Sequence, residues 1–424
     1  MTIALEMRPP SVQAVLPQPE PGLTPEQLIQ RAVDMRSVLR ADQAQSEKRG
    51  TYSPEMHERF KQAGFYRILQ PKMFGGYEFD LTVFSRVMVE VARGCPGTGW
   101  CLTLGSGHAL NVAALFSQSA QTKIFGSEGH FAAPLRGIPQ GVAKPVEGGW
   151  LVDGVWDYCS GVPYSTHAIV GVRIEGATAG GPPQLGVAIV PRAGWEMLDN
   201  WGGVIGMRAS GSNSVRIENA FIPDEFLVRQ NVFDMNIQAL PGYKLHGNPL
   251  YAGRMFGFFQ TEISSIMVGL GYAALDEFED IIAAKQKAPT LPGPGASLDD
   301  FYRAHGLAMG RLEAASHALN GGARSYEAYC RRGVEDVRQY TDSDDMLIQA
   351  GLQQAARLAF EAVDLLYCAA GTSIAANNGT RMQRYFRDVS MARTNPGLQF
   401  ERSAVRISTK HLSDRGVIAS PTKA

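Results

Sequence analysis

The chain has 424 residues, of which 45% are hydrophobic, enough for a large buried core and for two or three domains. Its 40 basic side chains balance 41 acidic ones, which excludes a general attraction to nucleic acid or to an anionic membrane. No apolar run approaches the roughly 20 residues that cross a bilayer, and the first residues do not combine a basic start with an apolar block. We therefore expect a cytoplasmic globular protein with a disordered, Pro-rich tail over residues 1–23.

The cysteines and histidines give no sign of a metal site or of a disulfide framework. The five cysteines are odd in number, scattered and mostly surrounded by apolar residues, which favours reduced, buried thiols. Neither they nor the eight histidines show the C-x-x-C or H-E-x-x-H spacing of common zinc sites. We expect no structural or catalytic metal.

The first predicted elements are helices. Thr24 precedes a proline and lies three residues before a glutamine, the pattern of an N-cap with a capping box. The stretches "SPEMHERFKQAGF" and "DLTVFSRVMVEVARG" repeat such start signals, the second from a capping Asp80 to a terminating Gly94. The next stretch, "TGWCLTLGSGHALNVAALF", is almost wholly apolar and predicts one helix that is buried on all sides. Residues 24–133 are therefore expected to form an N-terminal helical domain.

The pattern changes near Pro134 to short β-branched runs separated by turn residues. Strands are predicted at "GGWLVDGVWDY", "HAIVGVRI", "QLGVAIVP" and "SNSVRIENAFIP", and Asp153-Gly154 is typical of a hairpin turn. The spacing indicates a small antiparallel β-barrel or sandwich over residues 134–235.

Helical periodicity then returns and continues to the end of the chain. The long apolar run "FGFFQTEISSIMVGLGYAALDEFEDIIAAKQK" is followed by a break at "LPGPGA", by two further long helices and by a final helical segment. Residues 236–424 are thus predicted to form a C-terminal four-helix bundle, which makes the fold class α+β, mainly α. The helices from about Leu245 to Cys368 carry apolar faces too extensive for one bundle to bury, which predicts a homotetramer, or at least a dimer.

This order of elements, together with three short motifs, resembles the acyl-CoA dehydrogenase superfold from about residue 24 to residue 412. "DGVWDYCSG" is similar to the hairpin that faces the flavin in this family, "GMRASGSNSVRIENAFIP" to its Gly-x-Arg segment, and "RYFRDVSMARTNPG" to the Arg-Asp segment at the active-site end of its bundle. The resemblance implies that the Ser160 hydroxyl lies beside flavin N5. The residues that it implies for flavin binding are Trp156, Tyr158, Ser160, Gly161, Arg208, Ser210, Ser212 and Arg387.

Plainer explanations of several residues stay open at this point. Ser160 and the glycine after it are also typical of the end of a strand. The aromatic residues of the first motif, with Phe256 and Phe258, are candidates either for the wall of an aromatic substrate site or for the core. Arg208 and Arg387 are candidates for binding the flavin phosphate or for salt bridges in the bundle.

Two departures from the family pattern distinguish the branches of this superfold. A dehydrogenase needs a carboxylate base for the α-proton of its thioester substrate, and the family's usual place for this base carries Thr394-Asn395-Pro396 here. The family's Arg-x-x-Phe-Gly segment, which grips the FAD pyrophosphate, is replaced by "AAKQKAPTLPGPGA". Both departures are typical of flavin-dependent two-component monooxygenases of group D, the aromatic hydroxylases. An acyl-CoA dehydrogenase or flavin oxidase with tightly bound FAD, and a non-catalytic relative, remain as alternatives.

The stretch "TGWCLTLGSGHALN" adds a candidate catalytic residue. These monooxygenases commonly carry a pocket histidine at the position of His108, whereas Asn395 stands where many relatives have a second histidine. The alternative for His108 is a core histidine that is hydrogen-bonded within a buried helix. The candidate catalytic residues are therefore His108, Ser160 and Asn395.

The resemblance implies an oxygenase component that uses FMNH2 or FADH2 and O2. Through a flavin C4a-hydroperoxide, it would hydroxylate a small phenolic or indolic substrate. The glycine pairs of this chain do not follow a strand that opens a βαβ unit, so we expect no nicotinamide site. The expected partner is therefore a separate NAD(P)H:flavin reductase.

Overall fold

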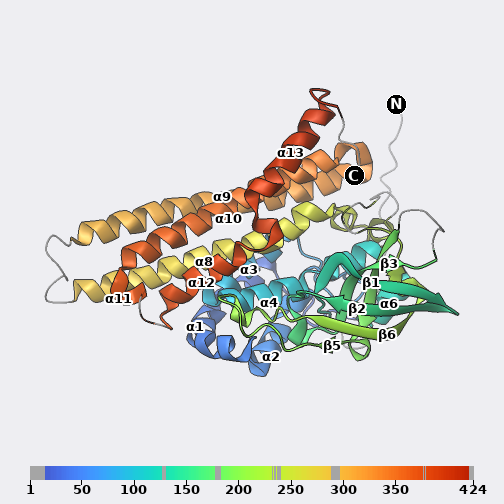
Figure 1. Cartoon of the computed structure of the whole chain (residues 1–424), viewed down its shortest axis with the longest axis horizontal. Coiled ribbons are helices and arrows are strands. Elements are labelled where there is room, and N and C mark those ends of the chain that lie inside the picture. The colour runs from blue at the N-terminus through green and yellow to red at the C-terminus, as the bar shows by residue number, and fades with distance from the viewer. Residues whose placement is uncertain are drawn as a thin grey trace.

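The computed structural model describes residues 15–126, 130–176, 183–231, 233, 235, 240–287, 297–375, 377 and 379–419. Helices lie before and after the strands in sequence, which confirms the expected fold class (Figure 1). The first helix begins as predicted, because the Thr24 hydroxyl accepts from the Gln27 amide and the Gln27 side chain accepts from the Thr24 amide. The helices before the sheet are α1 Pro25–Arg49, α2 Pro54–Ala63, α3 Leu81–Gly94, α4 Pro96–Ser106, α5 Ala109–Leu115 and α6 Gln118–Phe125.

Residues 15–23 correct the prediction of a disordered tail. The Leu16 amide donates to the Met73 carbonyl at 3.1 Å. Glu20 forms an ion pair with Arg31 of α1 at 2.7 Å. This segment is therefore fixed to the helical domain by a backbone bond and a charge pair that its Pro-rich composition did not reveal. The rest of the predicted tail lies outside the described residues.

The long apolar helix predicted after Gly94 is interrupted in the structure. Its residues form α4 and α5, which are separated by Gly107 and His108. The loop before the sheet packs on this interruption. The Ala133 amide donates to the Gly105 carbonyl at 2.8 Å, and the Ala133 carbonyl accepts from His108 Nδ1 at 2.8 Å. These two bonds fix the His108 ring at the junction of the two helices.

The strands form one sheet in the order β5-β6-β2-β1-β3-β4-β7. They are β1 Leu135–Val146, β2 Gly149–Trp156, β3 His167–Ile174, β4 Gln184–Pro191, β5 Glu196–Met197, β6 Val215–Pro223 and β7 Leu227–Val228. Neighbouring strands pair antiparallel apart from β1 and β3, which are parallel, a pair that the expectation of an antiparallel domain did not include.

The turn between β1 and β2 is not where the sequence predicted it. It is formed by Glu147 and Gly148, and Gly148 has a φ of 75°, in the left-handed region that favours glycine. Asp153 and Gly154 instead lie within β2, where the register against β6 shifts. The Asp153 carboxylate accepts from the Asn219 amide of β6 at 3.1 Å. The turn-like dipeptide therefore marks an irregular strand position rather than a hairpin.

The helices after the sheet supply the predicted bundle. They are α7 Gly242–His246, α8 Met255–Gln286, α9 Leu298–Glu335, α10 Asp342–Ala370, α11 Thr372–Ala375, α12 Arg381–Ala392 and α13 Phe400–Asp414. The long helices α8, α9 and α10 pack lengthwise with α12, and α13 leaves the bundle at an angle (Figure 1). The predicted break at "LPGPGA" falls outside the described residues. Among the helices described, none is long and apolar enough to cross a membrane.

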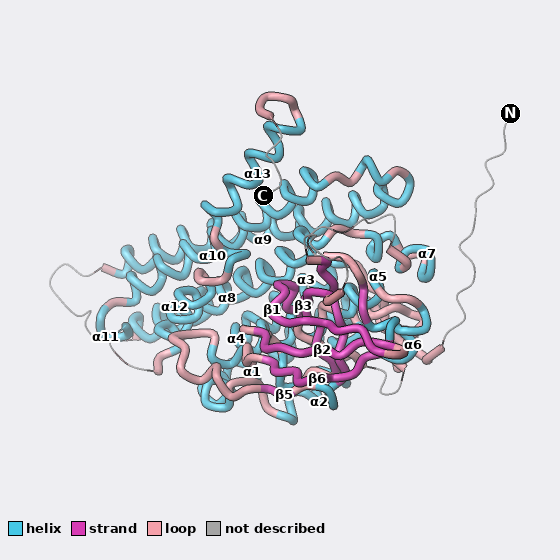
Figure 2. The backbone as a smooth tube through the Cα atoms, turned by 45° about the vertical axis from the view of Figure 1, so that its right-hand side comes forward, coloured by secondary structure: helices cyan, strands magenta, loops and turns pink. Residues whose placement is uncertain are grey.

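Helix α4 connects the three parts of the molecule. It packs against α8 of the bundle and against two turns of the β-domain, η2 (Val162–Tyr164) and η4 (Arg208–Ser210). Both views place α4 near the centre of the molecule (Figures 1 and 2). Because His108 follows α4 directly, this candidate lies where the helical domain, the sheet and the bundle meet.

Candidate active site

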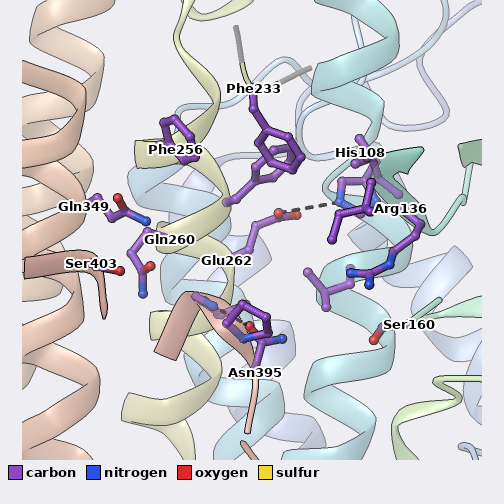
Figure 3. A pocket seen from close by; sticks show the side chains of 18 of the residues that line it. His108, Arg136, Ser160, Phe233, Phe256, Gln260, Glu262, Gln349, Asn395 and Ser403 are labelled. Carbon is purple, nitrogen blue, oxygen red and sulfur yellow. Dashed lines mark hydrogen bonds and ion pairs between the residues drawn. The ribbon is translucent and has the colours of Figure 1, made fainter. Parts of the chain in front are cut away.

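A cavity of about 510 Å³ lies between α4, β1, α8 and the segment that leads into α13. Four of the residues that the sequence singled out for catalysis or flavin binding line it, and these are His108, Tyr158, Ser160 and Asn395. Figure 3 shows His108, Ser160 and Asn395 around one space. The structure thus brings together all three candidate catalytic residues, although they belong to three separate parts of the sequence.

The Ser160 hydroxyl belongs to a short chain of polar groups behind the cavity wall. The indole N–H of Trp100 donates to Ser160 Oγ at 2.9 Å. The Ser160 and Ser212 hydroxyl oxygens are 2.8 Å apart, and the Ser212 and Ser210 oxygens are 2.6 Å apart. When Ser212 donates toward Ser160, the Ser160 hydroxyl hydrogen remains available for a group in the cavity. Ser210 and Ser212 therefore orient Ser160.

Gly161 determines how closely the Ser160 segment approaches α4. Its φ is 87°, which favours glycine. A Cβ atom at this position would lie 2.9 Å from the Cys101 carbonyl oxygen and 2.9 Å from the Gly105 backbone. Gly161 thus lets the strand end lie directly on α4, and this close contact carries Ser160 to the cavity wall.

His108 is held as a neutral imidazole. The bond from Nδ1 to the Ala133 carbonyl requires that Nδ1 carries the proton. Burial lowers the pKa of His108 to about 4, although hydrogen bonds to the backbone at Ala133 and Leu104 offset part of this effect. His108 Nε2 lies 3.7 Å from Glu262 Oε2. At neutral pH the ring is therefore uncharged, with its Nε2 lone pair available as an acceptor.

Glu262 of α8 is a site residue that the sequence analysis missed. Its side chain is fully buried, and neither carboxyl oxygen has a hydrogen-bond partner among the described residues. Burial raises the pKa of this carboxyl well above its usual value, which favours the protonated form. Figure 3 shows it directed across the cavity wall toward His108. The available signal was a single acidic residue within the apolar run "FFQTEISSIMVGLG".

Asn395 and Tyr158 lie at the edge of the cavity. Asn395 Oδ1 accepts from the Gly397 amide at 2.8 Å and so caps the turn before α13. Its amide group can donate a hydrogen bond but cannot exchange a proton near neutral pH. The Tyr158 ring is 52% exposed and packs edge-on against Trp201, with centroids 5.2 Å apart. Both residues can shape the site, and Asn395 does not replace a histidine chemically.

Trp156 and Phe258 do not reach this cavity. The Trp156 side chain is fully buried in the sheet, and its indole N–H donates to the Gly171 carbonyl at 2.9 Å. Phe258 is fully buried too, whereas Phe256 lines the cavity. Trp156 points into the core because alternate residues of a strand point to opposite faces, so this cavity does not support the predicted contact of Trp156 with the flavin.

The two arginines proposed for phosphate or for salt bridges lie away from the cavity. Arg387 forms an ion pair with Glu47 at 3.0 Å and donates to the Ile205 carbonyl at 2.8 Å. Arg208 donates to the Val204 carbonyl at 2.7 Å and lines a separate small hollow. For Arg387 the geometry matches the salt-bridge alternative.

The groups on the Ser160 side of the cavity fit a reduced flavin. Such a ring needs hydrogen-bond partners at its polar edge and apolar walls that exclude water. Ser160 and Tyr158 supply hydroxyl groups, and Leu104 and Leu135 supply apolar contacts. Arg136, a second residue missed from the sequence, is half-buried and adds a positive charge that favours an anionic reduced ring. These residues would hold the flavin.

Comparisons with known proteins agree with this geometry. A model of the acyl-CoA dehydrogenase N-terminal domain matches residues 26–125, and one of the acyl-CoA dehydrogenase C-terminal domain matches residues 262–400. The flavin-dependent monooxygenase oxygenase subunit HsaA of Rhodococcus jostii (strain RHA1) is 27% identical over 385 residues, which cover 90% of this chain and 97% of that protein. The crystal structure of 3-HSA hydroxylase from Rhodococcus sp. RHA1 is similar with a TM-score of 0.83 at 25% identity, covering 91% of this chain and 97% of that one.

A third relative is the oxygenase component of p-hydroxyphenylacetate 3-hydroxylase of Acinetobacter baumannii. It is 27% identical over 335 residues, which cover 78% of this chain and 76% of that protein. The chain belongs to the acyl-CoA dehydrogenase family. Within this family, both curated relatives described here are named as the oxygenase part of their enzymes, and not as dehydrogenases.

Proposed function

We propose that this chain is the oxygenase component of a two-component flavin-dependent monooxygenase that hydroxylates a small phenolic or indolic compound. The observation that carries the proposal is one cavity wall that combines Ser160, a neutral His108 and the buried Glu262 carboxyl. The names of the relatives support it. Reduced flavin, as FMNH2 or FADH2, supplies the electrons that activate O2 for transfer of one oxygen atom.

His108 positions the substrate in this proposal. Its Nδ1 proton is fixed by the Ala133 carbonyl, so Nε2 accepts a hydrogen bond from the hydroxyl or ring N–H of the substrate. Such a bond increases the electron density of the aromatic ring, which favours its attack on an electrophilic oxygen. Ser160 would donate to the polar edge of a bound flavin, and the buried surroundings would keep water away from the reacting atoms.

Glu262 bears on the alternative activity, because a dehydrogenase of this family needs a carboxylate base. Burial raises the pKa of the Glu262 carboxyl above its usual value, which favours its protonated form. Its position supports proton donation or hydrogen bonding next to His108. Because a catalytic base can also have a raised pKa, it is the names of the relatives that favour the monooxygenase over the dehydrogenase.

The proposal includes a partner and a location. A separate NAD(P)H:flavin reductase would supply the reduced flavin, because the sheet has helical segments on either side in sequence and no βαβ unit among the described residues. We also propose that the enzyme works in the cytoplasm, as expected from the sequence.

The proposal is tested by mixing the purified chain with chemically reduced FMN or FAD, O2 and a phenol or an indole. Hydroxylated product should form without a reductase, whereas NADH with oxidised flavin should give none until a reductase is added. Product and hydrogen peroxide are both measured, since peroxide reports reduced flavin that reacts with O2 without hydroxylation. Product from NADH and flavin alone would exclude the two-component assignment.

His108→Ala links this activity to the cavity. Product formation should fall by roughly 10²–10⁴-fold, the contribution typical of a group that handles a proton in the transition state. Hydrogen peroxide should replace the product, and flavin binding should be nearly unchanged because Ser160 is intact. His305→Ala, which removes a histidine on α9 outside the cavity, is the matched control and should retain activity. Unchanged product yield in His108→Ala would return His108 to a structural role.

A further inference from the structure

The cavity has a second wall, formed by the bundle, whose chemistry differs from that of the His108 wall. Polar side chains of α8, α10 and α13 line it, among them Gln349, Ser403 and Arg406. Figure 3 shows Gln349 and Ser403 across the cavity from His108. This wall is polar and basic, while the Ser160 side serves the flavin in the proposed function.

Two arginines of α13, Arg402 and Arg406, lie at the outer rim of this second wall. Arg406 is held in place, because its guanidinium carbon lies 4.3 Å from the centroid of the Phe256 ring and its Nη2 donates to Gln349 Oε1 at 2.7 Å. Arg402 makes a long bond of 3.4 Å to Gln399 Oε1. Among the described residues, neither guanidinium has a carboxylate within 4.0 Å. Both charges therefore remain available to a ligand.

The described residues that line the cavity include more basic than acidic side chains. Glu262 is the one carboxyl group among the described lining residues, and its burial favours the protonated, uncharged form. Asp345, which does not line the cavity, interacts electrostatically with Arg406. Arg136 adds a third positive charge on the flavin side. A cavity with this charge surplus favours anionic ligands over neutral ones of the same shape.

A row of aromatic rings connects the arginine rim to His108. The rings of Phe256 and Phe233 stack with centroids 5.8 Å apart, and Phe233 lies edge-on to Phe259 at 6.2 Å. Phe259 in turn lies edge-on to His108 at 6.1 Å. A flat aromatic ring can pack along this row, with one end near Arg406 and the other near His108.

We propose that the substrate is an aromatic acid whose carboxylate binds Arg406 and Arg402 while its hydroxyl or ring N–H reaches His108. This inference rests on the proposed function and names its substrate class. The planar guanidinium of Arg406 suits a carboxylate, because it presents parallel N–H groups to the two oxygens. The phosphate of a flavin has related chemistry, so the test has to separate the two ligands.

Binding is measured by isothermal titration of the flavin-free protein with 3-(4-hydroxyphenyl)propanoate and with its primary amide, which has the same shape and no charge. The acid should bind about tenfold more tightly than the amide, as one exposed charge-assisted contact provides. Arg406→Gln should abolish this preference, and Arg406→Lys should retain part of it. Arg415→Gln, which removes an exposed arginine at the end of α13 outside the cavity, should leave it intact.

The inference would be overturned if the wild type bound the acid and the amide equally. It would also be overturned if the preference for the acid survived in the Arg402→Gln/Arg406→Gln double variant. The flavin arm uses FMN and riboflavin, which differ by the phosphate. If Arg406→Gln weakens FMN and not riboflavin, the arginines bind the flavin phosphate, and the inference is also wrong. Selective binding of the acid without hydroxylation would retain the inference and reject the proposed function. Hydroxylation of neutral phenols with no preference for acids would retain the proposed function and reject the inference.

Discussion

At the level of single residues, the buried Glu262 carboxyl makes the stability of the fold depend on pH. In the unfolded chain this group loses its proton near its ordinary pKa of 4.5, whereas burial keeps it protonated to a higher pH in the folded chain. Above pH 4.5 the unfolded state is therefore the first to ionise, and the folded state becomes relatively less stable as the pH rises through the raised pKa. Glu262 thus lowers stability at neutral and alkaline pH, which is consistent with a functional role.

We predict that Glu262→Gln, which keeps the shape and cannot ionise, stabilises the protein in a pH-dependent way. The difference in the free energy of unfolding between variant and wild type should grow in favour of the variant as the pH rises above about 4.5. This difference in the free energy of unfolding can change by at most about 1.4 kcal/mol per pH unit. Chemical denaturation of variant and wild type at pH 5 and pH 8 measures this difference. Glu401→Gln, at an exposed position of α13, is the control, and a difference that does not change with pH would contradict the prediction.

Short motifs that resemble those of a known family predicted part of this site. His108 and Ser160 could be proposed because they belong to short motifs, and the fold brings both to one cavity. Glu262 could not be proposed, since its importance depends on burial between α4 and α8, helices that are far apart in sequence. The burial of Trp156 was not visible either, because the motif does not show which side of β2 meets the core.

At the level of secondary structure, the two-residue interruption between α4 and α5 places His108 next to α8. Gly107 makes this approach possible. A Cβ atom at Gly107 would lie 2.1 Å from Glu262 Oε1 and 3.0 Å from the Phe84 ring. The absence of a side chain at this one position therefore determines the distance between His108 and Glu262.

We predict that Gly107→Ala disturbs both stability and coupling. The added methyl group has to displace the Glu262 carboxyl or the Phe84 ring, and overpacking of this kind costs roughly 1–3 kcal/mol. Since Glu262 and His108 move apart, more hydrogen peroxide should form per hydroxylated product. Thermal or chemical unfolding gives the first effect, and the ratio of peroxide to product gives the second.

Gly105→Ala is the matched control, one half-turn earlier in α4. A Cβ atom there meets only the Gly161 backbone, at 3.7 Å or more, which is ordinary contact. Alanine also favours a helix over glycine. Gly105→Ala should therefore be neutral or slightly stabilising, with normal coupling. Equal effects of the two substitutions would show that the Gly107 contact with Glu262 is not specific.

Local sequence signals predicted the type of most elements but not their ends. The capping pattern at Thr24 fixed the start of α1, because caps are formed by neighbouring residues. The helix interruption at Gly107 and the position of the β1–β2 turn depend on the loop at Ala133 and on strand β6. Such long-range partners are not visible in a local pattern, which is why both predictions were wrong.

At the level of the whole molecule, the bundle retains large apolar side chains at its surface. Leu307 of α9 is 50% exposed, Leu347 of α10 is 48% exposed and Val405 of α13 is 70% exposed. Single exposed apolar residues are normal, but long helices that carry several of them favour association. These side chains support the predicted homotetramer.

We predict that light scattering gives a mass that is a multiple of 46.0 kDa, with four copies expected and two as the minimum. The double variant Leu307→Glu/Leu347→Glu should lower this mass, because it places charges on the surface that we expect to be covered. Val38→Glu, on α1 outside the bundle, should leave the mass unchanged. A stable monomer of the wild type would contradict the prediction.

The row of phenylalanines between Arg406 and His108 has a consequence for regiochemistry. A ring that is held at both ends cannot slide along the row, so one ring carbon would face the Ser160 side of the cavity, where the residues that would hold the flavin lie. The length of the side chain between ring and acid then decides which carbon this is. Homologous acids that are one methylene shorter or longer would be anchored at one end only, and their hydroxylation should yield mixtures of positional isomers in place of a single product.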